Sequence, residues 1–337
     1  MIDVLVAGGG PVGLAAAIQA RLAGLSATIV EPREGVIDKA CGEGLMPGAL
    51  PLLAGLGVDP AGMPLAGIGY RRGSTRVDHR FATGVGRGVR RTVLHSALAS
   101  RAAELGVERV VGRVSAVEQH ADGVVAGGIR ARWLLGCDGL HSNVRDLLGV
   151  ARASHGPRRF GLSRHYELAP WSDLVEVHWA PRAEVYITPL APNLVGVAFL
   201  GPPRTDPDAV LETLPELADR LRDAAHGGTR GAGPFRQRAS RVRVGRALLV
   251  GDASGYVDAI TGEGLRLGFE QARAAVACIV AGRVGDYERD WRRITREFRV
   301  STRNLVVAAT SPLRPAIVPL AAALPGVYGA AVERLAR

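Results

Sequence analysis

The sequence is poor in lysine, cysteine and aromatic residues, and each scarcity limits what the chain can be. Lys39 is the only lysine among 42 basic residues, so the net charge of +10 comes from arginine, which we interpret as a compositional bias. Cys41, Cys137 and Cys278 are too few and too far apart for a disulfide scaffold, which favours a reducing, cytoplasmic location. No Cys/His spacing predicts a metal site. No basic run with interleaved aromatic residues predicts nucleic-acid binding.

Long uninterrupted hydrophobic segments are also scarce. Residues 4–20 carry no charge, but they lack the basic start of a signal peptide and contain a glycine motif. Residues 315–332 are also uncharged, but prolines and glycines interrupt them, which predicts two short apolar helices. A peripheral membrane contact is the alternative interpretation of this run. With 337 residues, 47% of them hydrophobic and 22% charged, the chain is long enough for two globular domains.

The first thirty residues predict a dinucleotide-binding unit. A short apolar run, 2–7, predicts a buried strand, and Gly8, Gly10 and Gly13 follow it as G-x-G-x-x-G. A helix-like stretch comes next, and then a second apolar run that ends at Glu31. Glycines let a backbone approach a pyrophosphate, a helix N-terminus attracts it, and an acid in this position binds ribose hydroxyls.

Three further stretches carry a resemblance to a known family. Residues 137–145 read C-D-G-L-H-S-N-V-R, residues 251–253 read G-D-A and precede T-G-E-G at 261–264, and Arg91 opens an amphipathic helix. Together with the fingerprint they resemble the FAD-dependent monooxygenase superfamily of the p-hydroxybenzoate hydroxylase fold. The family usually has a proline before the T-G-E-G turn, where this chain has Ala259.

The resemblance implies a set of FAD-binding residues drawn from most of the chain. In order they are Gly8, Gly10, Pro11, Val12, Gly13, Glu31, Pro32, Arg33, Cys41, Gly42, Arg91, Val114, Asp138, Gly139, Gly251, Asp252, Thr261, Gly262, Glu263 and Gly264. No second dinucleotide fingerprint is present, so NAD(P)H is expected to act as a transient reductant without a domain of its own.

The expected fold class is α/β, with a Rossmann-type FAD-binding domain, an inserted antiparallel-sheet substrate domain and a C-terminal helical tail. Residues 159–201 alternate like four strands separated by turns, and one helix is expected over 207–225. The predicted segments are 1–65, 86–156 and 236–285 for FAD binding, 66–85 and 157–235 for the substrate, and 286–337 for the C-terminal helices.

Candidate pocket residues lie on the strands of the substrate domain. Because residues of like parity share one face of a strand, Arg164 and Tyr166 are expected to be neighbours, as are Tyr186 and Thr188. His178 and Trp179 are further candidates. We predict Cys41, Tyr186 and Arg164 as the catalytic residues.

Two enzymatic interpretations remain open. The family resemblance favours a monooxygenase that uses FAD and NAD(P)H to hydroxylate or epoxidise a small hydrophobic, aromatic metabolite through a flavin hydroperoxide. The stretch K-A-C-G-E-G-L at 39–45 resembles K-x-C-G-G-G-L of geranylgeranyl reductases, with Glu43 in place of a glycine, and keeps open a reductase of isoprenoid double bonds. A third reading is a non-catalytic, membrane-associated FAD-binding protein. A monomer or homodimer is expected.

Overall fold

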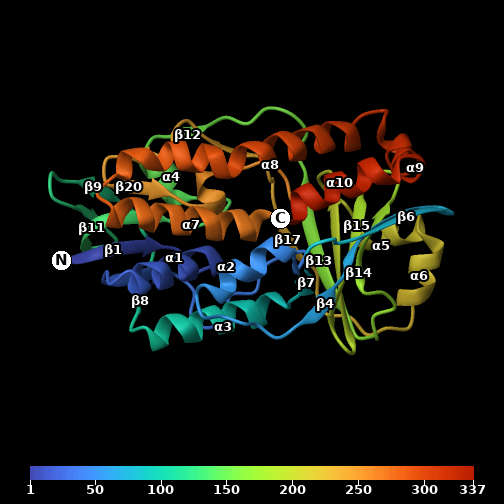
Figure 1. Cartoon of the computed structure of the whole chain (residues 1–337), viewed down its shortest axis with the longest axis horizontal. Helices are drawn as coiled ribbons and strands as arrows, with labels where there is room; N and C mark the ends of the chain where they lie inside the picture. Colours follow the sequence, from blue (N-terminus) through green and yellow to red (C-terminus); the bar gives the residue numbers. More distant parts are fainter.

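Two large sheets flanked by helices form most of the protein, and the chain passes between these sheets several times (Figure 1). The computed structural model describes residues 1–337. The first sheet contains β1 (Ile2–Ala7), β2 (Ala27–Glu31), β8 (Glu108–Val111), β9 (Val117–Gln119), β10 (Val124–Ala126), β11 (Ile129–Gly136), β19 (Arg243–Val244) and β20 (Ala247–Leu249). Its main path runs β19-β20-β11-β1-β2-β8. The strands from β20 to β8 on this path pair in parallel, whereas β19 pairs antiparallel with β20.

The central strands of the first sheet are buried because helices cover them. The helices of this half are α1 (Pro11–Leu22), α2 (Leu50–Ala54), α3 (Arg91–Glu104), α4 (Asn143–Leu147) and α7 (Gly264–Val280). All five residues of β2 are buried, as expected for a parallel strand with both faces covered. The expected β1–glycine loop–α1–β2 unit is therefore present, with β1 over the predicted residues.

The second sheet has seven strands in the order β17-β13-β16-β15-β14-β5-β6. Their bounds are β5 (Gly67–Arg72), β6 (Thr75–Arg80), β13 (Phe160–Tyr166), β14 (Leu174–Trp179), β15 (Glu184–Ala191), β16 (Leu194–Gly201) and β17 (Arg230–Ala232). The predicted antiparallel sheet is thus confirmed except at one place, because β5 and β14 pair in parallel. Two three-stranded sheets complete the set: β3 (Gly44–Leu45), β7 (Gly86–Gly88) and β4 (Met63–Leu65), and β12 (Ala151–Arg152), β18 (Gln237–Ala239) and β21 (Gly255–Tyr256).

The helix expected over 207–225 is wrong in one respect. The structure has two short helices there, α5 (Pro207–Glu212) and α6 (Pro215–Leu221). Leu214, at φ −128° and ψ 68°, leaves the helical conformation because the ring of the following proline disfavours it. These two helices pack on the β13–β16 part of the second sheet through Leu211, Leu217 and Leu221.

The C-terminal part is helical, as predicted. It contains α8 (Tyr287–Ala309), α9 (Ile317–Ala323) and α10 (Pro325–Ala336), and the last two are the short apolar helices expected over 315–332. No single helix has the length and hydropathy needed to cross a bilayer, although the pair Val284–Ala309 and Arg314–Ala323, bent by 108°, has both when taken together. The strands of the first sheet come from 2–31, 108–136 and 243–249, and those of the second from 67–80 and 160–232, so the two halves interleave in the sequence.

Candidate active site

A cavity of about 970 Å³ extends from the carboxyl end of β1 to the second sheet. Every charged residue in its wall comes from the FAD-binding segments. The wall contributed by the second sheet, the segment between β17 and β18, and the C-terminal helices holds no charged side chain. It includes Ile68, Tyr70, Val175, Val177, Ala198, Leu200, Phe235, Leu305, Val332 and Leu335. The cavity therefore has a charged half and an apolar half.

The glycine loop at the charged half lets two backbone segments touch. Gly8 has φ of +103°, and a Cβ there would lie 2.6 Å from the Cys137 carbonyl oxygen. A Cβ on Gly13 would lie 1.9 Å from the Gly8 carbonyl oxygen, so only glycine fits. Helix α1 begins directly after the loop, with no acidic residue in its first turn and no side chain capping its N-terminus. Its free amides are thus available to an anion.

Glu31 is buried at the end of β2 and stays charged. Its carboxylate accepts hydrogen bonds from the Gly9 N–H at 2.8 Å and from the Arg33 Nε at 2.7 Å. Burial would raise the pKa of Glu31, but these hydrogen bonds outweigh it, and the pKa lies below its ordinary value. The acid predicted to bind ribose hydroxyls is therefore an ionised acceptor at the cavity wall.

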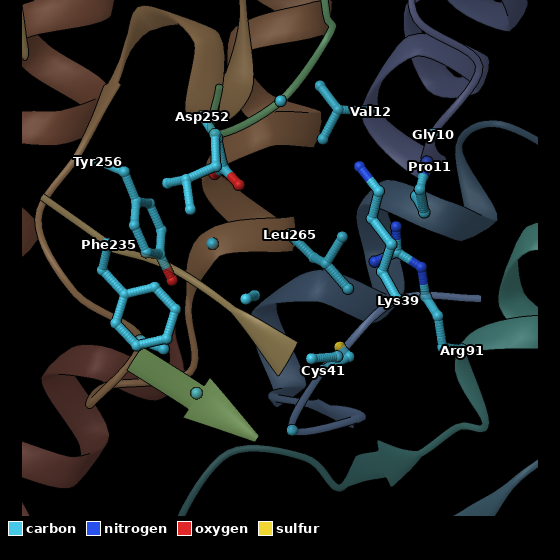
Figure 2. A pocket seen from close by; sticks show the side chains of 18 of the residues that line it. Gly10, Pro11, Val12, Lys39, Cys41, Arg91, Phe235, Asp252, Tyr256 and Leu265 are labelled. Carbon is cyan, nitrogen blue, oxygen red and sulfur yellow. The ribbon is translucent and has the colours of Figure 1, made fainter. Parts of the chain in front are cut away.

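Three cations converge on the same end of the cavity. Lys39 and Arg91 lie side by side facing the loop of Gly10 and Pro11 (Figure 2), and Arg33 is close by. Burial lowers the pKa of Lys39, and the like charges of Arg33 and Arg91 lower it further. The buried Arg91 Nε has no hydrogen-bond partner. Arg33 is paired with Glu31, whereas Lys39 and Arg91 form no ion pair, and two free cations beside a helix N-terminus fit a pyrophosphate.

Asp252 faces these cations across the cavity (Figure 2). Burial raises the pKa of its carboxyl to about 6, against the opposing effect of Arg91, Lys39 and Arg145. No protein hydrogen bond contributes to that pKa, so the carboxylate is free to accept one from a ligand hydroxyl. The preceding Gly251 donates its N–H to the Gln271 Oε1 at 2.8 Å and does not line the cavity.

The D-G-x-x-S motif has a structural role beside its place in the wall. The Asp138 carboxylate accepts hydrogen bonds from the Ser142 hydroxyl at 2.5 Å and from the Val144 N–H at 2.9 Å, which holds the start of α4. The Asn143 side chain donates to the Val114 carbonyl at 3.2 Å. Asp138, Gly139 and Val114 all line the cavity.

The turn before α7 contributes Thr261, Gly262 and Gly264 to the wall, while Glu263 points elsewhere. Glu263 is buried in an ion pair with Arg266, and burial raises its pKa to about 7 although Arg266 opposes the shift. The first turn of α7 contains no acid, so the positive end of its dipole faces the cavity at Gly264 and Leu265.

Strand β15 holds the two loops that flank the cavity. The Tyr186 hydroxyl donates to the Ile260 carbonyl at 2.8 Å, and the Thr188 hydroxyl donates to the Gly42 carbonyl at 2.9 Å. Both residues line the cavity from one face of the strand, as parity predicted. Burial raises the pKa of Tyr186 well above its ordinary value. Its hydroxyl therefore stays protonated, and its proton is already donated to the Ile260 carbonyl.

Arg164 does not reach the cavity. Its guanidinium pairs with Asp208 on α5 and donates to the Thr229 hydroxyl at 2.6 Å, and Tyr166 on the same face is buried against α5 and α6. Around Arg164 and Tyr166 that face of β13 packs on helices, so the structure does not bring Arg164 to the cavity with Cys41 and Tyr186. His178 and Trp179 are also outside the cavity wall, as are Gly13, Gly251 and Glu263. The other predicted cofactor residues, including Pro32, lie in the wall.

Cys41 lines the cavity between its two halves (Figure 2). Burial raises the pKa of its thiol above the ordinary value, which Arg91 only partly offsets. Its sulfur lies 3.4 Å from the Glu43 backbone N–H. At neutral pH it is a neutral thiol, so it lines the site as a weakly polar group and lacks the thiolate that a nucleophile needs.

Glu43 is the residue whose role the sequence did not reveal. Its buried carboxylate accepts hydrogen bonds from the Arg91 N–H at 2.7 Å and the Arg90 Nη1 at 3.0 Å, and lies 2.6 Å from the His165 Nε2. Glu43 thus joins the cavity loop, the start of α3 and strand β13. Its φ of +58° lies in the left-handed region that favours glycine, the residue of the resembled K-x-C-G-G-G-L stretch, so the hydrogen bonds of the carboxylate offset a strained backbone.

Comparison with known proteins gives the family. The family model described as "FAD binding domain" matches residues 1–283. The chain belongs to this family. It is 29% identical over 332 residues to a menaquinone reductase of Mycolicibacterium smegmatis, across 88% of this chain and 80% of the relative. It is 30% identical over 299 residues to a rifampicin monooxygenase of Streptomyces venezuelae, across 81% of this chain but only 62% of that relative.

A solved structure shows the same fold. The anhydrotetracycline hydroxylase from Streptomyces rimosus is 26% identical, with a TM-score of 0.71, and the match covers 99% of this chain and 76% of that one. The resemblance stated from the motifs is therefore confirmed, and the chain is an FAD-dependent oxidoreductase. The relatives divide between monooxygenases and reductases, so the family does not decide the reaction.

The charged half of the cavity fits FAD. The glycine loop, the amides of α1 and the three cations suit its pyrophosphate, and Glu31 and Asp252 are acceptors for its sugar hydroxyls. The N-terminal end of α7 would stabilise negative charge on the reduced ring.

Replacing Asp252 tests this assignment. Asp252→Ala removes the free acceptor, so the purified protein should lose most of its yellow absorbance, and its FAD affinity should fall roughly 10- to 100-fold. Asp252→Asn keeps the shape and should lose less. Full FAD occupancy in Asp252→Ala would show that the residue is not a ligand.

The pKa of Asp252 predicts a pH effect in the FAD-free protein. A folded pKa of about 6, raised from 3.8, favours the folded state below pH 3.8, and this contribution is lost as the pH rises through about 6. The Asp252→Asn side chain does not ionise, so this variant does not lose stability in this way as the pH rises. Its melting temperature should therefore exceed that of the wild type by an amount that grows from pH 4 to pH 7 and then levels off. A constant difference across this range would contradict the assignment.

Three substitutions at Glu43 separate its carboxylate from its backbone. Glu43→Gln should lower the free energy of unfolding by about 2–3 kcal/mol, because a buried charged acceptor is lost. Glu43→Gly loses the same acceptor but relieves the left-handed backbone, so it should be about 1 kcal/mol more stable than Glu43→Ala. Denaturant unfolding of the three variants measures both differences, and equal stability of the Gly and Ala variants would argue against backbone strain.

Proposed function

We propose that the protein is a monooxygenase that uses FAD and transient NAD(P)H to hydroxylate or epoxidise a small, neutral, hydrophobic metabolite. One observation carries the proposal: the apolar half of the cavity contains no charged side chain. A substrate with a carboxylate or a diphosphate would lose its hydration there without gaining an ion pair. A neutral hydrophobic substrate loses little hydration free energy when it enters this half of the cavity.

Aromatic side chains favour a flat, aromatic substrate. Tyr70, Tyr186, Phe235 and Tyr256 contribute to the cavity wall from four different segments. The hydroxyls of Tyr70 and Tyr256 make no protein hydrogen bond that affects their titration, and burial raises the pKa of both tyrosines above the ordinary value. Both hydroxyls therefore stay protonated and are available to donate to an oxygen of the substrate.

The two halves of the cavity support two separate roles, cofactor binding at the charged half and substrate binding at the apolar half. FAD supplies the redox chemistry, by accepting hydride from NAD(P)H and passing electrons on to oxygen or to a double bond. The protein holds the cofactor at the charged end, excludes water at the apolar end and orients the substrate between the aromatic rings. A dry site protects reactive species from side reactions with water.

Reduction of a double bond in a neutral isoprenoid is the second candidate. Cys41 lies in the cavity wall within the segment that resembles geranylgeranyl reductases. The match to the menaquinone reductase also spans 80% of that relative, against 62% for the rifampicin monooxygenase. The uncharged wall disfavours a diphosphate-bearing isoprenoid under either reaction. As part of the proposal, the protein acts in the cytoplasm, as a monomer or homodimer, with a peripheral membrane contact that is argued below.

Product analysis tests the proposal. The holoenzyme is incubated with NADPH or NADH and a panel of aromatic polyketides, quinones and neutral isoprenoids, with oxygen-18 gas in one arm and no oxygen in the other. We expect substrate-stimulated NAD(P)H oxidation, oxygen uptake and a product that carries one labelled oxygen atom. Carboxylated analogues of an active substrate, as the matched control, should be turned over at least about tenfold more slowly. A product that gains two hydrogen atoms under anaerobic conditions would replace the monooxygenase with the reductase.

A further inference from the structure

Exposed apolar side chains gather on the C-terminal helices. Of fourteen large hydrophobic residues that are exposed, six lie between residues 300 and 327. Four of these form what we name the apolar tip: Leu313, Leu320, Leu324 and Val327, each 54–66% exposed. They lie on α9, on α10 and in the turn before α9, where Figure 1 shows the chain reversing at one end of the molecule. No charged residue occurs between 315 and 332.

Helix α8 leads to the apolar tip and carries arginine and valine in alternation on one face. Arg296, Val300, Arg303 and Val307 follow each other at spacings of four, three and four residues, which places them on one side of the helix. All four are exposed. Neither arginine forms a hydrogen bond or ion pair within the protein, because the acidic residues of α8, Glu288, Asp290 and Glu297, all pair with other arginines.

A second group of arginines beside α8 also lacks acidic partners. Arg152 and Arg238 lie directly opposite each other on the paired strands β12 and β18, and Arg236 directly precedes β18. Burial lowers the pKa of Arg299 on α8, and the charges of the nearby Arg238 and Arg236 lower it further. Like charges opposite each other on paired strands are destabilising, so this surface is complementary to an external anion.

From these observations we infer that α8, the apolar tip and the neighbouring arginines form a surface that binds an anionic phospholipid bilayer. The arginines would lie at the phosphate headgroups and the tip would enter the acyl boundary. Basic and apolar side chains together on one helical face fit a lipid surface better than an aqueous protein partner, which would leave the tip's apolar area without a matching groove. No helix needs to cross the bilayer for this contact.

The proposed contact lies close to the cavity. Helix α10 presents Val327 to solvent and Val332, Leu335 and Ala336 to the cavity wall, and α8 contributes Leu305 to the same wall. The apolar half of the cavity would therefore be one helix away from the lipid. This proximity bears on substrate entry only if the proposed function is correct, whereas the surface itself does not depend on it.

Vesicle co-sedimentation of the full-length holoenzyme tests the inference. The vesicles contain phosphatidylcholine alone, or three parts phosphatidylcholine to one part phosphatidylglycerol. We expect binding to the anionic vesicles, weaker binding to the neutral ones, and loss of the difference at high salt. Leu320→Ser/Leu324→Ser should reduce binding to anionic vesicles by at least about tenfold, because both side chains are lost from the apolar boundary.

Matched variants separate the surface from general hydrophobicity and charge. Val111→Ser/Val280→Ser removes two side chains that are equally exposed elsewhere, and should bind as the wild type does. Arg296→Gln/Arg303→Gln should reduce binding to anionic vesicles several-fold and leave binding to neutral ones unchanged. All variants should retain FAD absorbance and melting temperature, since the altered residues are exposed.

Three results would overturn the inference: no vesicle binding by the wild type, equal binding by the Leu320/Leu324 variant, or a dimer in vesicle-free solution that this variant converts to monomer. The last would assign the tip to contact between two copies of the chain. Vesicle binding requires no turnover, so failure here leaves the proposed function untouched, and failure of the product assay leaves the surface untouched.

Discussion

One face of strand β15 fixes the geometry on which the cavity depends. Glu184, Tyr186 and Thr188 succeed each other on that face, and each bonds to a segment of the chain outside the second sheet. The buried Glu184 pairs with Arg159 and with Arg314, and Arg159 continues to Asp258 at 3.0 Å. Tyr186 and Thr188 hold the backbone of the two cavity loops. The distance between cofactor site and substrate wall is therefore set by one strand.

Because these ion pairs and hydrogen bonds are buried, they are strong, and the loss of one partner destabilises the protein. An ion pair at the interior is costly to break, since removal of one partner leaves the other charge desolvated. Asp258 also accepts a hydrogen bond from the Ile260 N–H at 3.0 Å, so the same loop is held from two directions. A loop held by several bonds keeps its position, and a redox site needs this because small displacements between cofactor and substrate lower the rate greatly.

The sequence predicts the local parts of this molecule well and the long-range parts poorly. The unit from β1 to Glu31 follows from its own residues, because a glycine loop, a helix start and a buried strand are all local features. The prediction that Arg164 lies in the pocket does not match its position, because the period of a strand gives two faces without saying which one meets the cavity. Here both faces are covered, one by α5 and α6 and the other by the cavity. Glu43 stood out as a departure from the glycine pattern, but its partners Arg90 and His165 are 47 and 122 residues away.

The interleaved path of the chain also determines how such a site can change. The residues of the cavity wall range from residue 7 to residue 336 and come from both large sheets, the loops between them and the C-terminal helices. No contiguous fragment contains the site, so it cannot be transplanted as a module or exchanged between proteins by recombination of domains. New substrate preferences in this architecture must instead arise by single replacements on β5, β14 and β16, whose side chains meet the cavity without bonding to either cofactor loop.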